Sequence, residues 1–238
     1  MIITLGDIHG RFNLLQTNIT NLNLSDCVII QVGDFGVGFD NLKNDLQTLT
    51  VLNKFLSDRD IQLFVIRGNH DGPTFFTGDK YFFSNIFLLK DYSTISYGSE
   101  GKKILCVGGA ISVDRGNDSE GPWQGRVEGF DYWKDENFVL DEAKLKVMSD
   151  VDIVLTHSAP DFCFPHGVTG TQKWINSNPE LYFELIKERE DLTKMYNILS
   201  ENNKIRQWCY GHFHSGKRDE YLDTKFVLLS IDEFYEIR

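Results

Sequence analysis

The sequence has little cysteine and no long apolar run. Its four cysteines lie far apart and form no Cys-x-x-Cys pair, so neither a disulfide framework nor a structural zinc site of the cysteine type is indicated. The first residues show neither the basic segment nor the apolar stretch of a signal peptide. The apolar runs elsewhere are far too short to cross a bilayer. We therefore expect a protein of the reducing cytoplasm that has no membrane partner.

Basic residues are also scarce, because 24 Lys and Arg stand against 35 Asp and Glu and give a formal net charge of −11. A protein that coats an extended nucleic acid neutralises many phosphates with Lys and Arg, so this balance weighs against such a partner. A small phosphorylated substrate is compatible with it, since a local site can handle the charge. The length of 238 residues and the hydrophobic fraction of 41% fit a single globular domain over residues 1–238. The oligomeric state stays open.

The apolar pattern of the first third of the chain alternates between strands and helices. Short apolar runs predict strands at 2–5, 27–32 and 61–66, and apolar residues at helical spacing predict helices at 12–22 and 42–56. Glycine-bounded runs with helices between them are typical of βαβ units in a buried parallel sheet. The remaining predicted elements are strands at 86–89, 94–97, 104–107, 151–155, 207–210 and 225–231 and a charged helix at 178–202.

A long irregular segment, at about 108–137, interrupts this pattern. A loop of that length inside a compact domain is often a functional lid or a binding loop. It carries the aromatic residues Trp123, Phe130, Tyr132 and Trp133. Two interpretations are open. These rings stack on an aromatic or nucleoside leaving group, or they cap the sheet and bury one another.

Metal-binding residue types follow five of the predicted strands. In open α/β sheets, ligands bind beyond the carboxyl ends of the strands. Five of the six histidines of the chain lie in these segments. Where an extended segment alternates, as in Asp7-x-His9 and His212-x-His214, both side chains return to the same side. The segments are Gly6-Asp7-Ile8-His9-Gly10, Gly33-Asp34-Phe35-Gly36, Arg67-Gly68-Asn69-His70-Asp71, Thr156-His157 and Gly211-His212-Phe213-His214.

The ligand types indicate the kind of metal site. Imidazole, carboxylate and an amide oxygen, without thiolate, suit Mn²⁺, Fe or Zn²⁺. The five segments together offer seven candidate ligands. This number is too large for one ion, but it fits two ions that share a carboxylate. Two ions roughly 3.5–4 Å apart form a clamp for in-line phosphoryl displacement. The pattern therefore predicts a dimetal site for phosphate chemistry.

The order of these motifs resembles that of the calcineurin-like metallophosphoesterase superfamily. Its pattern is Asp-x-His, Gly-Asp, Gly-Asn-His-(Asp/Glu), His and Gly-His-x-His, and the match runs from Asp7 to His214. The resemblance implies an α/β fold, a four-layer α-β-β-α sandwich with a dimetal site at the carboxyl ends of the strands. It also implies a phosphoesterase in which a hydroxide that bridges the two ions attacks phosphorus in line. Mn²⁺ is the first choice of cofactor, and Fe or Zn²⁺ are alternatives.

The resemblance also assigns roles by position. In that assignment Asp34 bridges the two ions, and His70 is not a ligand but contacts the scissile phosphate and protonates the leaving group. The adjacent Asp71 is a candidate partner for the protonated His70. The first metal takes Asp7, His9 and His214, and the second takes Asn69, His157 and His212.

One motif departs from the protein Ser/Thr phosphatases of this superfamily. They carry an Asp that orients the catalytic histidine and an Arg that grips phosphate, where this chain has Val37 and Gly38. That subfamily is therefore not indicated, and the loop segment 108–115 is more similar to bacterial and phage-encoded phosphoesterases. Another cation should hold the phosphate, and guanidinium suits it because it offers paired donors. The candidates are Arg11, Arg115 and Arg126.

Two other function classes compete with a phosphoesterase for small substrates. The first is a nuclease or a nucleotide-directed phosphodiesterase, which the net charge disfavours only for long duplexes. The second is a non-catalytic scaffold of the same fold. Such scaffolds usually lose ligands, most tellingly the Asn-His pair, whereas Asn69 and His70 are present here.

Overall fold

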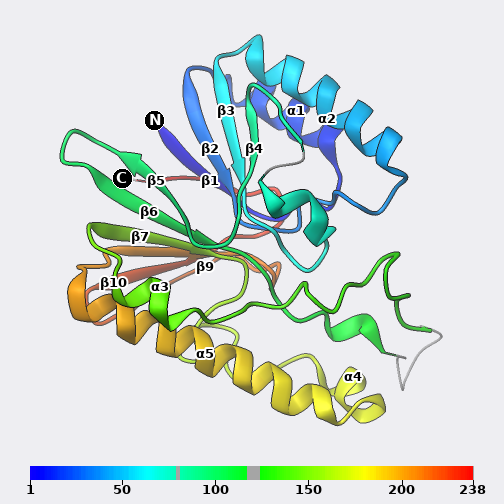
Figure 1. Cartoon of the computed structure of the whole chain (residues 1–238), viewed down its shortest axis with the longest axis vertical. Helices are drawn as coiled ribbons and strands as arrows, with labels where there is room; N and C mark the ends of the chain where they lie inside the picture. The colour runs from blue at the N-terminus through cyan, green and yellow to red at the C-terminus, as the bar shows by residue number, and fades with distance from the viewer. Residues whose placement is uncertain (79–80, 117–123, 238) are drawn as a thin grey trace.

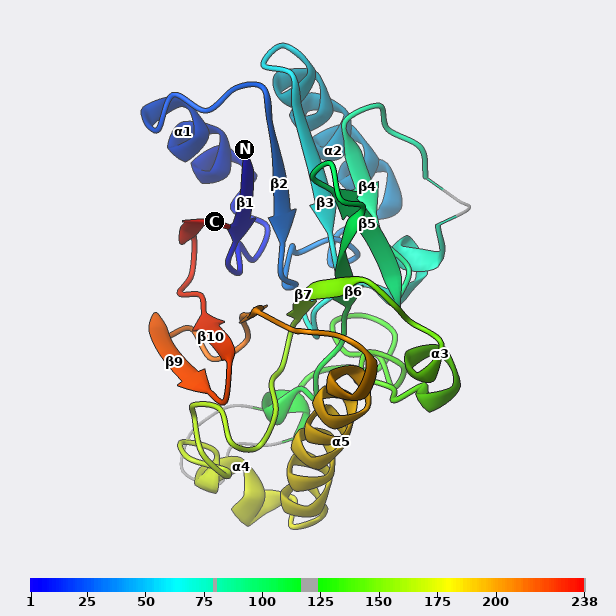
Figure 2. The ribbon, with the colours of Figure 1, turned by 90° about the vertical axis from the view of Figure 1, so that its left-hand side faces the viewer.

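A computed structural model describes residues 1–78, 81–116 and 124–237 of the chain. Two β-sheets lie face to face, and helices cover the outer face of each (Figure 1). The layers follow the order helix, sheet, sheet, helix, which confirms the predicted four-layer α-β-β-α sandwich. Helices α1 and α2 lie on one side of the paired sheets, and α3 and α5 lie on the other (Figures 1 and 2).

The first sheet has five strands in the order β11-β1-β2-β3-β4. The parallel strands β1 to β4 come from the predicted βαβ region, and β11 (Phe234–Glu236) pairs antiparallel with β1 at the edge. Helix α2 begins where Asn41 accepts the backbone N–H of Asn44, a typical N-cap. The elements are β1 (Ile2–Leu5), α1 (Phe12–Asn21), β2 (Cys27–Gln31), α2 (Leu42–Ser57), β3 (Ile61–Val65), the 3-10 turn η1 (Pro73–Thr77) and β4 (Ile86–Leu88).

The second sheet has six strands in the order β5-β6-β7-β8-β10-β9. Its four central strands are parallel, and the edge strands β5 and β9 are antiparallel to their neighbours. The elements are β5 (Ser93–Tyr97), β6 (Lys102–Val107), the 3-10 turn η2 (Val113–Arg115), α3 (Glu142–Lys146), β7 (Val151–Thr156), α4 (Gln172–Ser177), α5 (Glu180–Asn202), β8 (Gln207–Tyr210), β9 (Lys217–Tyr221) and β10 (Thr224–Leu228).

Three apolar layers fill the spaces between the four structural layers. In β2, Ile29 packs toward α1 and α2, while the next residue, Ile30, packs between the two sheets. In β7, Val154 packs toward α5, and Ile153 and Leu155 pack between the sheets. Because both faces of β2 and β8 are largely buried, these strands read as nearly continuous apolar runs in the sequence, whereas β3 has an exposed Gln62 on one face. The stacked sheets thus form a rigid base for the loops at their carboxyl ends.

The elements that sequence patterns missed are short or polar. Strand β9 reads Lys-Arg-Asp-Glu-Tyr, because an edge strand is largely exposed, and its pattern carries no apolar alternation. Strand β11 has three residues and helix α3 has five, which is too few for a periodic signal. The strand predicted at 225–231 ends at Leu228, where the chain turns toward β11. Among the described helices, none is long and apolar enough to cross a membrane.

Candidate metal centre

Four residues from three strand ends form a first ligand cluster. One ligand atom from each of Asp7, His9, Asp34 and His214 lies within 4.8 Å of the others. Nε2 of His9 is 3.0 Å from Nε2 of His214, and the latter is 3.2 Å from Oδ2 of Asp7. Two imidazole nitrogens at that distance require a proton or a cation beside them, because two lone pairs repel each other. The donor set of this cluster fits a divalent ion.

A second cluster contains Asp34, His157 and His212, with the side chain of Asn69 against it. Nδ1 of His157 lies 2.8 Å from the carbonyl oxygen of Val32, which can only accept, so Nδ1 carries a proton. The other nitrogen, Nε2, therefore points into the cluster and is the one that can bind a metal after it loses its proton. It lies 3.1 Å from Oδ1 of Asp34 and 3.1 Å from Oδ1 of Asn69.

The electrostatics of the second cluster show the same demand for a cation. Burial lowers the pKa of His157, but the charges of Asp34 and Asp7 outweigh burial and raise it to about 10. A proton on Nε2 then occupies the place that a metal ion would take. The site favours positive charge at this point although it is fully buried, which is the behaviour expected of a metal pocket.

Asp34 is the residue that the two clusters share. Its carboxylate is 1% exposed, and Oδ1 accepts the backbone N–H of His70 at 2.7 Å. Burial raises the pKa of Asp34, but the charge and the hydrogen bond of His157, with smaller effects of the same sign from His70 and His9, outweigh it and hold the pKa well below its usual range. Asp34 therefore carries a charge that faces both clusters, as a bridging ligand must.

The backbone at this centre is held in an uncommon conformation. His9, Asp34, His212 and His214 have φ angles between +46° and +66°, a region that residues other than glycine rarely adopt. Such strain persists only where the surrounding structure enforces it, and it gathers at functional sites. At Gly68 a Cβ atom would overlap Oδ1 of Asp34, so glycine is required there for the carboxylate to keep its place.

His70 lies beside the first cluster but outside both ligand sets. Its ring is 5.0 Å from the ring of His9 and stacks on Phe39 at 5.9 Å. Nη2 of Arg126 lies 2.5 Å from Nε2 of His70, so the guanidinium donates to the ring. Burial lowers the pKa of His70 to about 4, and the charge of Arg126 acts in the same direction.

Of the three candidate arginines, Arg126 is the one that reaches the centre. Its side chain is 3% exposed and pairs with Asp114 at 2.6 Å. Nη1 also donates to Oγ of Ser112 at 3.2 Å, and the same oxygen accepts Nδ2 of Asn69 at 3.0 Å. Ser112 therefore turns Oδ1 of Asn69 toward His157 and fixes Arg126 near His70. Sequence reasoning missed the role of Ser112, since one serine in a long loop carries no signal.

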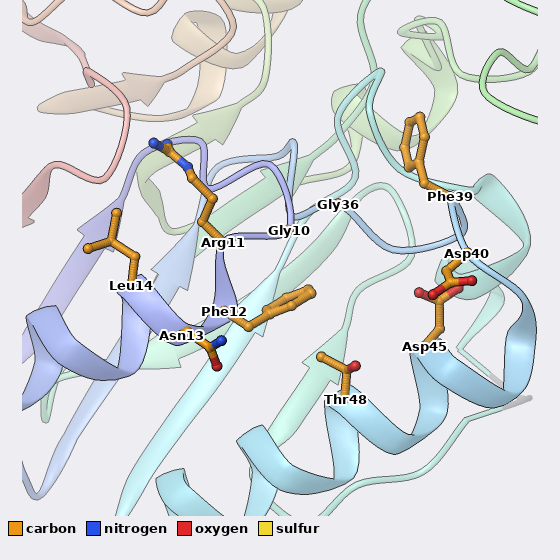
Figure 3. Close-up of a pocket in the computed structure, with 10 residues that line it drawn as sticks. All are labelled: Gly10, Arg11, Phe12, Asn13, Leu14, Gly36, Phe39, Asp40, Asp45 and Thr48. Atoms are coloured by element: carbon orange, nitrogen blue, oxygen red, sulfur yellow. The ribbon is translucent and has the colours of Figure 1, made fainter.

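The other two arginines have carboxylate partners elsewhere. Arg11 pairs with Asp232 at 2.9 Å and donates to the backbone oxygen of Ile8 at 3.0 Å. It lines an open cavity of about 810 Å³ together with Phe12, Phe39 and other residues (Figure 3). Arg115 pairs with Glu184 of α5. A phosphate bound by any of the three arginines competes with a carboxylate, and what distinguishes Arg126 is its contact with His70.

Asp71 does not pair with the ring of His70, which corrects the interpretation from the sequence. The carboxylate is fully buried and accepts four backbone N–H groups, at distances of 2.7–3.3 Å. Burial raises its pKa to about 7, and the charge of Asp34 acts in the same direction. Asp71 thus joins the second and third motifs through the backbone. The donors are Phe35, Gly36, Val37 and Gly68.

The long loop is anchored beside the third motif. Arg67 donates to the backbone oxygens of Glu136 and Asn137 and pairs with Asp91 at 2.7 Å. Of the aromatic residues in the loop, Trp133 packs edge-on against Phe39 at 5.2 Å, and Phe130 is exposed. Trp123 lies outside the described residues. The described part of the loop therefore reaches the centre through Arg126, Ser112 and Trp133.

The fold and the two clusters that share a carboxylate define the class of metallophosphoesterases. The model of the family described as calcineurin-like phosphoesterase matches residues 1–216. The chain therefore belongs to the calcineurin-like phosphoesterase family, which comprises metal-dependent phosphate ester hydrolases. No sequence among the curated proteins matches the chain.

Three solved structures are similar to this chain at low identity. A Staphylococcus aureus protein described as a 5′-nucleotidase has 14% identity and a TM-score of 0.49, and the match covers 97% of this chain and 48% of that one. GAP50, the anchor in the inner membrane complex of Plasmodium, has 15% identity, coverages of 96% and 70% and a TM-score of 0.44. Phosphopantetheinyl hydrolase from Mycobacterium tuberculosis has 12% identity, coverages of 97% and 89% and a TM-score of 0.48. The chain thus spans about half the length of the S. aureus protein.

Proposed function

We propose that this protein hydrolyses a phosphate ester of a small molecule with two divalent metal ions as cofactors. The observation that carries the proposal is Asp34, which two ligand clusters share while His70 and Arg126 stand beside them. When bound, two divalent ions would activate the attacking water and offset negative charge on the phosphate oxygens during in-line displacement. Asp7, His9, Asp34 and His214 would hold one ion, and Asp34, Asn69, His157 and His212 the other.

The phosphate is held by Arg126 in this proposal. Its guanidinium is a planar donor that is already oriented by Asp114 and Ser112, so little side-chain freedom is lost on binding. A phosphate oxygen that accepts from Arg126 falls within reach of Nε2 of His70, because the two nitrogens are 2.5 Å apart. Once the phosphate replaces Nε2 as the acceptor for Arg126, its negative charge favours the protonated form of His70, and Nε2 is then placed to deliver a proton to the leaving oxygen.

The proposed metal is Mn²⁺, with Fe or Zn²⁺ as alternatives. The clusters offer carboxylate, amide oxygen and imidazole, which these ions accept. The four cysteines are all free and buried outside the clusters, so thiolate ligation plays no part in this proposal. Free cysteines also support a reducing compartment, and we propose the cytoplasm as the location.

A small substrate is favoured over an extended nucleic acid. The net charge of −11 opposes the neutralisation of many phosphates, and Asp114 already balances Arg126. A nucleotide-directed phosphodiesterase is the second candidate. Phe39, stacked on His70 and packed against Trp133, offers an aromatic surface beside the centre on which a base could stack. A steep salt dependence of substrate binding would instead indicate a polymer.

The test uses Mn²⁺-loaded protein and a panel of substrates. We expect turnover of an aryl phosphate or a bis-aryl phosphodiester that chelator abolishes and that Asp34→Asn lowers by at least about 1000-fold. Asp223→Asn, the same change at an exposed position, is the matched control and should leave activity unchanged. The proposal fails if the loaded protein turns over neither monoesters nor diesters faster than the Asp34→Asn variant. The panel also contains nucleoside monophosphates, cyclic nucleotides, dinucleoside polyphosphates and phosphopeptides.

A further inference from the structure

A second, smaller cavity lies against the metal centre on the side of helix α5. Its volume is about 200 Å³, below the roughly 300–1,000 Å³ of pockets for drug-sized ligands, so it suits a short organic group. His212, a residue of the second cluster, lines this cavity. The opposite wall comes from α5 and from the loop of residues 165–171. A group that enters the cavity is therefore next to the proposed site of hydrolysis.

The walls of this cavity are mainly apolar, and two of the residues that line it, Ser158 and Glu188, each have one buried polar atom without a hydrogen-bond partner in the described part of the chain. Leu185, Val113 and Phe213 contribute apolar surface. Arg189 also lines it, but its guanidinium donates to the backbone oxygens of Pro160, Cys163 and Pro165, so it serves to hold the neighbouring loop.

The two atoms are Oγ of Ser158, a residue that is 1% exposed, and Oε2 of Glu188, a residue that is 6% exposed. Both atoms are buried and have no hydrogen-bond partner among the described residues, and Oε2 of Glu188 is the one that can only accept when the carboxyl is ionised. Burial raises the pKa of Glu188 to about 7 against the lowering effect of Ser158 and Arg189. A buried carboxylate oxygen without a partner costs stability, so each such group in a native structure needs an explanation, and a bound hydrogen-bond donor supplies one.

We propose that this cavity binds the organic part of the substrate and that Oε2 of Glu188 accepts a hydrogen bond from an O–H or N–H group on it. This assignment rests on the proposed function, and it narrows the substrate class to phosphate esters of short alcohols that carry a second hydrogen-bond donor. The phosphate itself is excluded from the cavity, since a buried carboxylate repels it. The cavity thus holds the leaving group while Arg126 holds the phosphate.

The first test compares two esters that differ in one group, 4-hydroxybutyl phosphate and 4-methoxybutyl phosphate, at pH 8. The hydroxyl donates and the methoxy oxygen only accepts, so we expect kcat/KM to favour the hydroxyl ester by about tenfold. In Glu188→Gln, an amide N–H₂ takes the place of Oε2 because the other oxygen faces the backbone N–H of Ile111. The amide N–H₂ can donate to the oxygen of either ester, so the ratio of the two kcat/KM values should fall to about one. An unchanged preference in this variant overturns the proposal.

The second test does not depend on hydrolysis or on the folding of a core variant. Binding of 1,4-butanediol to the protein loaded with diamagnetic Zn²⁺ is followed by saturation-transfer NMR. Thr169 lines the cavity and is exposed, so Thr169→Trp should obstruct the entrance and abolish the diol signal. Thr17→Trp, at an exposed position of α1, is the control and should bind as the wild type does. If the diol binds equally to both variants, the cavity is not the site. If the diol binds in the cavity but the protein hydrolyses no ester, the cavity remains a binding site for the diol and the phosphoesterase proposal is refuted.

Discussion

The guanidinium of Arg126 donates to the imidazole of His70, with Nη2 2.5 Å from Nε2. Val37, which stands where protein Ser/Thr phosphatases carry an Asp that orients this histidine, is fully buried in the core. In this protein the ring is held by Arg126 on its nitrogen and by Phe39 on its face. The long loop therefore supplies a contact that a neighbouring motif supplies in those phosphatases.

The two arginines of the long loop should differ sharply in function. Arg126→Lys keeps the charge but loses the paired donors and the contacts with Ser112 and His70. We expect kcat/KM to fall by about 10- to 100-fold, the value of a charge-assisted hydrogen bond. Arg115→Lys, the matched control, disturbs a pair with Glu184 and should change kcat/KM by less than about threefold. Steady-state kinetics with one aryl phosphate measures both, and equal losses would show that Arg126 has no special role.

Replacement of His214 should reduce the number of metal ions bound per chain by one. His214 belongs only to the first cluster, so His214→Ala should lower the Mn²⁺ content from two ions to one per chain at limiting free metal. His166→Ala removes an exposed histidine that is in neither cluster and should leave two ions bound. Equilibrium dialysis with elemental analysis gives the stoichiometry. Retention of two ions by His214→Ala, with wild-type affinity, would contradict the assignment of the first cluster.

We expect Asp71 to contribute mainly to the stability of the fold and not directly to catalysis. Asp71→Asn replaces one carboxylate oxygen by a donor that faces backbone N–H groups, so at least one buried bond is lost. We expect the free energy of unfolding to fall by about 1–3 kcal/mol in urea titrations with chelator present. Metal affinity should weaken with it, because the turns of the second and third motifs lose their link. If the Asp71→Asn variant has wild-type stability but an altered pH profile of kcat, the result would instead support a direct contact between Asp71 and His70.

The stability of the loop anchor should depend on pH through Glu136. Burial raises the pKa of this carboxyl from 4.5 to about 7, so the folded state binds its proton more tightly than the unfolded state. The contribution of Glu136 to the free energy of unfolding is therefore fully present below pH 4.5. It is lost as the pH rises from 4.5 to about 7, and the total loss is up to about 3 kcal/mol.

Urea titrations at pH 5 and pH 7.5 with chelator present test this dependence. The difference in unfolding free energy between the wild type and Glu136→Gln should shrink as the pH rises. Glu128→Gln changes an exposed carboxyl that pairs with Lys134, and its difference should stay flat. A constant difference for Glu136→Gln would show that this carboxyl keeps its ordinary pKa in the folded protein.

The strand ends explain why the sequence was informative about the metal centre. Asp7, Asp34 and Asn69 follow strands that are mainly apolar, so their place at the sheet edge could be inferred from apolar runs alone. The side-chain partners could not be inferred, since Ser112 lies in a loop and Glu188, which lines the neighbouring cavity, lies in a helix, and neither has a motif around it. Asp71 was misread for the same reason, because adjacency in the chain to His70 does not show which way a carboxylate points.

One oxygen atom, Oγ of Ser112, accepts from both Asn69 and Arg126. Asn69 is a proposed metal ligand and Arg126 the proposed phosphate holder, so the two binding events meet at a single hydroxyl. Thermodynamic linkage then requires reciprocity: whatever factor the second ion adds to phosphate affinity, phosphate adds to the affinity for that ion. Product release and metal retention are coupled quantities in such a centre: where the factor favours binding, release of phosphate lowers the affinity for that ion by the same factor.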